Sequence, residues 1–183
     1  MNNFDSTLPQ LSIKGKKITV PIVQGGMGVG VSLYPLARAV ALQGGLGIVS
    51  SACLDRLVSR RTGKKLNSYE AAFEEVSLAK AEGGFAGINI MCALVRDYEA
   101  SVRGALDAGA DAIISGAGLP LTPPAIQPPR DTALIPIVSS GRALDLIGRD
   151  DHRTLDPRRA LQRQQQRRQQ CQGQQSDGSE KPA

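Results

Sequence analysis

A cluster of glycines near the N-terminus is the first stretch of the sequence whose residue types could do chemistry. Residues 21–30 read PIVQGGMGVG, an apolar run that enters a glycine-rich turn. Glycines let the backbone come close to a planar ring or a phosphate, and free N–H groups near a helix start attract electron-rich atoms. The stretch is not a Rossmann fingerprint, because Leu33 fills the third glycine position, and no GK[ST] follows to make a P-loop. A ligand-binding loop and a plain tight turn therefore both fit the spacing.

A polar residue inside an apolar run marks a second candidate position. Asn89 lies within GINIM, residues 87–91. A buried amide without a hydrogen bond costs about 1–3 kcal/mol, so Asn89 needs a partner. Near the carboxyl end of a barrel strand that partner can be a ligand, and otherwise it is a neighbouring main-chain group.

The remaining chemical candidates are weaker. Residues 115–120 (SGAGLP) and 139–141 (SSG) follow two later apolar runs, where they would line a catalytic face or merely cap a helix. His152 is the only histidine, and it stands in a polar segment, so we assign it no role. Cys53, Cys92 and Cys171 are far apart and form no CxxC pair, so neither a disulfide framework nor a metal site is expected.

Five short apolar runs are expected to be the strands that position these residues. Each is bounded by Gly, Ser or Pro, and near-continuous apolar runs are typical of parallel strands buried on both faces. The runs are residues 18–23, 47–50, 86–91, 112–115 and 134–138.

Amphipathic segments between the runs carry helix start and stop signals. Asn67 and Glu70 have the spacing of a capping box. The expected N-caps are Ser32, Asn67, Asp97 and, for a last helix that runs through Ile147, Ser139 or Ser140. The expected stops are Gly44, Gly83 and Gly109.

This alternation predicts an α/β fold. The closed (β/α)8 TIM barrel and the open doubly wound sheet both use repeated βα units, and about five units are found where a barrel has eight. We expect residues 1–148 to be the N-terminal part of a (β/α)8 barrel. Residues 149–183, which include LQRQQQRRQQCQGQQ, are expected to be a disordered Arg/Gln-rich tail.

Composition limits the classes of partner. The chain of 183 residues has a net charge of +5, but much of the excess lies in the tail. The body has no basic stripe interleaved with aromatic residues, so nucleic acid is not expected as a partner. There is no apolar leader and no run long enough to span a bilayer, so a cytoplasmic protein without membrane contact is expected.

Five blocks along the chain resemble, in order and approximate spacing, the nitronate monooxygenase family, formerly called 2-nitropropane dioxygenases. The resemblance extends roughly from Leu11 to Ile147. The blocks are PIVQGGMGVGVS, LARAVALQGGLGIVSSA, GINIM, DAGADAIISGAGLP and IPIVSSGRAL.

The resemblance implies an FMN-binding TIM barrel, a flavoprotein oxidoreductase that oxidises alkyl nitronates with molecular oxygen. In the family the QGGM segment lies against the isoalloxazine ring and an Asn of the third strand contacts the flavin. The implied cofactor-binding residues are Gln24, Gly25, Gly26, Met27 and Asn89. A flavin-dependent enoyl-acyl-carrier-protein reductase, which shares the QGGM block, and a non-catalytic fragment are the alternatives.

The sequence departs from the family after the fifth run. The family's later histidine-containing block and the glycine loops that hold the FMN phosphate have no counterpart, so no catalytic residue is assigned. We therefore expect this chain alone to retain FMN weakly or not at all, and its activity as a truncated chain stays open. The open sheet edges are expected to favour self-association.

Overall fold

The computed structural model describes residues 11–118, 129 and 131–145. The chain divides into two compact units, Met1–Ser139 and Ser140–Ala183. In the second unit, the described residues form a helical turn in which the N–H of Ala143 donates to Oγ of Ser140 at 3.3 Å. Ser140 therefore caps this turn, as the sequence predicted. The predicted tail, residues 149–183, lies outside the described residues.

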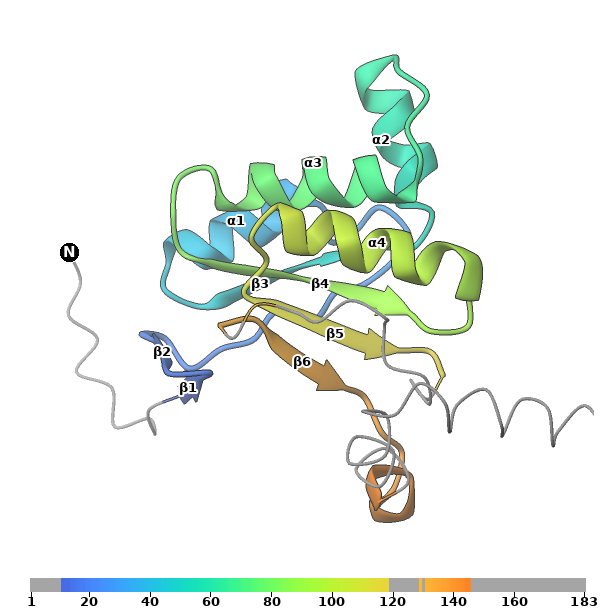
Figure 1. Ribbon diagram of the computed structural model, residues 1–183. Helices are drawn as coiled ribbons and strands as arrows, with labels where there is room; N and C mark the ends of the chain where they lie inside the picture. Colours follow the sequence, from blue (N-terminus) through green and yellow to red (C-terminus); the bar gives the residue numbers. More distant parts are fainter. Residues whose placement is uncertain (1–10, 119–128, 130, 146–183) are drawn as a thin grey trace, which may run out of the picture. The chain divides into compact units, whose positions relative to one another are not determined.

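A four-stranded parallel sheet forms the centre of the first unit (Figure 1). Its strands lie side by side in sequence order: β3 (Leu46–Ser50), β4 (Phe85–Met91), β5 (Ala112–Gly116) and β6 (Ala133–Pro136). The α/β class and four of the five predicted strands are confirmed, with their bounds shifted by one or two residues at some ends.

The first predicted strand, residues 18–23, is wrong as drawn. Ile18 ends β2 (Lys16–Ile18), which pairs antiparallel with β1 (Leu11–Ile13) in a hairpin that the sequence did not predict. Beyond it, the chain runs beside β3 with a single parallel bridge between Val23 and Leu46. The N–H of Ile22 donates to the carbonyl oxygen of Val20 at 2.6 Å instead of to β3, so this segment forms no regular ladder.

Four helices pack on one face of the sheet: α1 (Tyr34–Leu42), α2 (Leu54–Thr62), α3 (Ser68–Lys80) and α4 (Val95–Asp107). Figure 1 shows α1, α3 and α4 lying along this face. They form one core with every second strand residue, because successive side chains of a strand point to opposite faces. Fully buried members of this core include Ala37, Val49, Val76, Ile88 and Val102.

The opposite face of the sheet, which we call the inner face, carries a smaller core. Its buried members are Leu46, Ile48, Ala112 and Ala133, against which Ile13 of β1 packs. None of the described helices contributes to this cluster. A doubly wound sheet has helices on both faces, so the described part of the chain has the layering of a singly wound βα series instead.

Asp111 joins the hairpin to the amino end of the sheet. Its Oδ1 lies 2.6 Å from Nζ of Lys16, and its Oδ2 lies 2.5 Å from Nζ of Lys80. The N–H of Ala86 donates to the same carboxylate at 3.0 Å. The amino end of the sheet is therefore held by ion pairs and hydrogen bonds from the hairpin, α3 and β4.

The predicted helix starts had mixed outcomes. The capping box is confirmed, because Oδ1 of Asn67 accepts from the N–H of Glu70 at 3.0 Å and the Glu70 side chain accepts from the N–H of Asn67 at 2.9 Å. Ser32 and Asp97 are not N-caps; these positions belong to Leu33 and Leu94. Helix α2 was not predicted at all.

Within the described residues, no helix has both the length and the apolar character needed to cross a lipid bilayer.

Candidate functional site

The glycine-rich loop between residues 24 and 32 lies at the carboxyl end of the sheet, next to β4. Nδ2 of Asn89 donates to the main-chain carbonyl oxygen of Gly26 at 3.0 Å. The structure thus brings together two of the five residues that the resemblance implies for the flavin, although 63 positions separate them in the sequence. The hydrogen-bond partner that Asn89 needs is a main-chain group.

Gly26 is required by close packing on the inner face. A Cβ atom at this position would lie 2.6 Å from Cβ of Asn89 and 2.9 Å from Cγ2 of Ile48. Real Cβ atoms do not approach so closely. Gly26 therefore lets the loop lie directly on β3 and β4. The glycine is needed here for packing, whether or not a ligand binds.

Gln24 and Ser32 shape the loop. Oε1 of Gln24 accepts from the N–H of Ile48 at 2.9 Å, and its Nε2 donates to Oγ of Ser32 at 2.9 Å. The buried Ser32 hydroxyl in turn donates to the carbonyl of Gly25 at 3.1 Å and accepts from the N–H of Met27 at 2.9 Å. Gln24 is therefore a positioning residue, and Ser32, which we expected to cap a helix, organises the loop instead.

Gly25 and Met27 present the open surface of the loop. The Met27 side chain is 62% exposed. A Cβ atom on Gly25 would meet only Sδ of Met27, at 3.8 Å, so the space above Gly25 is free. Within the described part of the chain, the N–H groups of Gly25 and Gly26 and Oδ1 of Asn89 have no hydrogen-bond partner. An open backbone, free donors, a free acceptor and an apolar side chain fit the edge and face of a flavin ring.

The end of β5 contributes differently from what was expected. Gly116 belongs to the inner face, where an added Cβ would lie 2.9 Å from Cδ1 of Ile137 and 3.7 Å from Oδ1 of Asn89. Ser115 points to the helix side, where its hydroxyl lies 2.8 Å from that of Tyr98. Gly116, and not Ser115, therefore borders the candidate flavin surface.

Cys92 and Tyr98, near the carboxyl end of the sheet, have raised pKa values. Burial raises the pKa of the Cys92 thiol, and hydrogen bonds from its own backbone and from Ser115 only partly offset this. Burial likewise raises the pKa of Tyr98, against the lowering effect of its hydrogen bond with Ser115. Both groups therefore stay protonated. The described residues also contain no group of three or more His, Cys, Asp or Glu that could hold a metal ion.

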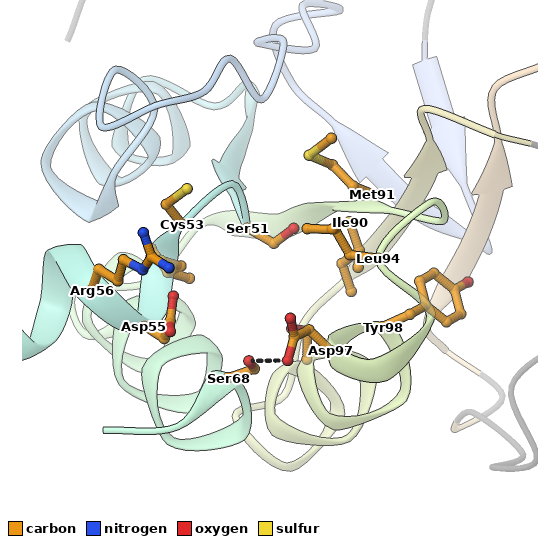
Figure 2. Close-up of a pocket in the computed structure, with 12 residues that line it drawn as sticks. Ser51, Cys53, Asp55, Arg56, Ser68, Ile90, Met91, Leu94, Asp97 and Tyr98 are labelled. Carbon is orange, nitrogen blue, oxygen red and sulfur yellow. Dashed lines mark hydrogen bonds between the residues drawn. The ribbon is translucent and has the colours of Figure 1, made fainter. Parts of the chain in front are cut away.

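A separate cavity lies on the helix side of the sheet, at the carboxyl ends of its strands. It is lined by the ends of β3 and β4 and the first turns of α2, α3 and α4 (Figure 2). Sequence reasoning missed it, because α2 was missed. The available signal was the spacing of Leu54, Leu57 and Val58 with Gly63 as a stop.

No model of a known protein family matches the chain, and no curated protein matches it.

Proposed function

We propose that this chain carries the ring-binding part of an FMN site in a TIM-barrel flavoprotein, and that the reaction of this site is the oxidation of alkyl nitronates by molecular oxygen. The substrate class rests on the resemblance of the five sequence blocks. The parallel sheet in sequence order, with its described helices on one face, supports the barrel.

The observation that carries the proposal is the loop surface built on Asn89 and Gly26. The hydrogen bond between them fixes a glycine backbone over the carboxyl ends of β3 and β4, which is where barrel enzymes bind their ligands. Gln24 and Ser32 hold the loop in this shape, so that Gly25 and Met27 stay open.

In this site the flavin supplies the electron-transfer chemistry, and the protein supplies position and polarity. The free N–H group of Gly25 would donate to the polar edge of the ring. The exposed side chain of Met27 would cover an apolar part of it. Oδ1 of Asn89 would accept a hydrogen bond from a ring N–H.

Flavin titration of the full 183-residue chain tests the cofactor. The proposed surface would contact the ring and not the phosphate. FMN and riboflavin should therefore bind with similar affinity, as measured by the quenching of flavin fluorescence. Gly25→Ala places a methyl group where the ring would lie and should weaken both affinities about tenfold or more. The control is Ala81→Leu, which adds apolar bulk at an exposed position after α3, at the amino end of the sheet. Equal affinities in both variants and the wild type would refute a ring site at Gly25.

Oxygen uptake tests the reaction. With excess FMN, the chain should consume oxygen with propyl-2-nitronate faster than free FMN does, and without NADH. An uptake no faster than that of free FMN would contradict nitronate oxidation by this chain. NADH oxidation with an enoyl thioester would instead support the enoyl reductase alternative.

A further inference from the structure

The cavity on the helix side of the sheet is a separate site from the candidate flavin surface. Its volume is about 240 Å³. Ile90 lines it and belongs to the helix-side core, whereas the neighbouring Asn89 reaches Gly26 on the inner face. At about 30 Å³ for one water molecule, the cavity has room for a molecule of roughly five to eight non-hydrogen atoms.

One wall of the cavity is acidic. Asp97 of α4 and Asp55 of α2 both line it, and Figure 2 shows the Asp97 carboxylate facing Ser68. Oγ of Ser68 donates to Oδ1 of Asp97 at 3.0 Å. Neither carboxylate forms a salt bridge with any residue in the described ranges. Arg56 also lines the cavity; its side chain and that of Asp97 are both exposed, so that water and salt screen both charges, whereas Asp55 is half-buried.

A buried hydroxyl at the base of this wall lacks a partner. Ser101 is only 5% exposed and lines the cavity, and its hydroxyl makes no hydrogen bond with any described residue. No fully buried side-chain oxygen or nitrogen in the described part of the chain lacks a partner, so the Ser101 oxygen must open on the cavity. Ser101 follows Asp97 by four positions on α4, which places both on the same side of the helix.

The rest of the lining is mostly apolar. Leu54, Ile90 and Leu94 come from three different elements and line the cavity together with the acidic wall. Leu54 and Ile90 are buried members of the helix-side core, whereas Leu94 is 47% exposed. The cavity thus combines a short apolar surface with a cluster of acceptors at one side.

We propose that this cavity binds a small organic cation, a primary ammonium group on a short aliphatic chain. The ammonium group donates to Asp97 and to the Ser101 hydroxyl, while the chain lies against Leu54, Ile90 and Leu94. An ammonium has three donors and a positive charge, which match the Ser101 hydroxyl and two carboxylates that form no salt bridge within the described ranges. The site is independent of the proposed flavin site.

Other ligand classes fit the lining less well. Asp55 and Asp97 repel a carboxylate or a phosphate. A hard metal ion such as Ca²⁺ needs six to eight oxygen ligands, and the described residues offer no group of three acidic, His or Cys side chains. A neutral alcohol would satisfy Ser101 but would leave the acidic charge uncompensated.

The test is an NMR titration of the full 183-residue chain with n-butylamine, which is a cation at neutral pH. Butyrate and n-butanol have the same chain length and serve as ligand controls. We expect saturable shifts at residues around Ser101 with butylamine, and at least tenfold weaker binding of the other two.

Three variants locate the binding site. Asp97→Asn should weaken butylamine binding about tenfold, because it removes the charge but keeps the acceptor for Ser68. Ser101→Ala should weaken binding by a smaller factor, and circular dichroism verifies that each variant is folded. Glu99→Gln is the matched control, since it removes the same charge from an exposed position of the same helix.

Two results would overturn the proposal. One is binding of butylamine that is no tighter than that of butyrate or n-butanol. The other is an equal loss of affinity in Asp97→Asn and Glu99→Gln, which would mean that butylamine responds only to the overall charge of α4.

Discussion

The side-chain amide of Asn89 donates a hydrogen bond of 3.0 Å to the main-chain oxygen of Gly26 and so ties the glycine-rich loop to β4. The contact joins the loop and the strand of the candidate flavin surface, which are 63 positions apart in the sequence. It has consequences for stability that are separate from any consequence for flavin binding.

Asn89→Leu should lower the free energy of unfolding by about 1–3 kcal/mol, because it leaves the carbonyl of Gly26 without its partner. Urea denaturation measures the change. Gln43→Leu is the control, since it replaces an exposed amide at the end of α1. A loss in Asn89→Leu no larger than that in the control would show that the hydrogen bond contributes nothing to stability.

Gly26→Ala and Gly25→Ala should separate structural from functional glycines. The first places a methyl group 2.6 Å from Cβ of Asn89 and should cost about 1–3 kcal/mol of stability. The second has free space and should leave the stability nearly unchanged, although it weakens flavin binding. Thermal unfolding of both variants checks the pair, and equal midpoints would contradict the packing argument.

The stability contribution of Asp111 should depend on pH. Burial alone would raise its pKa, but hydrogen bonds from Lys16, Lys80 and the N–H of Ala86 outweigh burial and hold the pKa below its ordinary value of 3.8. A carboxyl group with a lowered folded-state pKa stabilises the fold above its unfolded-state pKa. That stabilisation is lost as the pH falls through the lower, folded-state value.

Asp111→Asn should therefore cost about 1.5–3 kcal/mol at neutral pH, and the difference from the wild type should shrink at pH values below 3.8. Urea unfolding at several pH values measures this. Asp131→Asn is the control, because its side chain is 67% exposed and lies 3.3 Å from Nζ of the same Lys16. A pH-independent difference between Asp111→Asn and the wild type would mean that the ion pairs are not the cause.

The capping box of α3 should respond to the type of residue at position 67. Asn67→Ala removes the acceptor for the N–H of Glu70 and should cost about 1 kcal/mol. Asn67→Asp keeps an acceptor at the helix N-terminus and should retain most of the stability. If chemical denaturation finds the two variants equally destabilised, the side-chain cap is not what stabilises the helix start.

The sequence predicted those elements whose signals are local. The capping box at Asn67 lies within four residues, and β4 is a near-continuous apolar run, so both could be predicted from short windows. Four strands predicted from apolar runs were confirmed for this reason. The alternation of runs and helices fitted both a barrel and a doubly wound sheet, so the order of the strands came from the structure.

Features that depend on distant parts of the chain were missed or misassigned. Ser32 has the residue type of an N-cap, but its hydroxyl forms hydrogen bonds with the side chain of Gln24 and the loop backbone. Ile18 looks like part of a central strand, yet it pairs in a hairpin that rests on Asp111, far along the sequence. No local pattern contains such information.

The candidate site could be predicted only in part. The residue types of Gly25, Gly26 and Asn89 suggested a ligand, and the hydrogen bond between Asn89 and Gly26 gives two of them a place in the fold. The spacing could not show that position 26 must be glycine because of close packing, whereas position 25 has free space above it. That distinction depends on the positions of Ile48 and Asn89 beneath the loop.

The ion pair between Lys16 and Asp111 also sets an order of events during synthesis. The two residues are 95 positions apart, and a chain is made from its N-terminus. The hairpin therefore leaves the ribosome long before its anchoring carboxylate exists. Its ion pair with Asp111 cannot form until the start of β5 has emerged, so a contact of the earliest part of this fold to be made is among the later contacts to form.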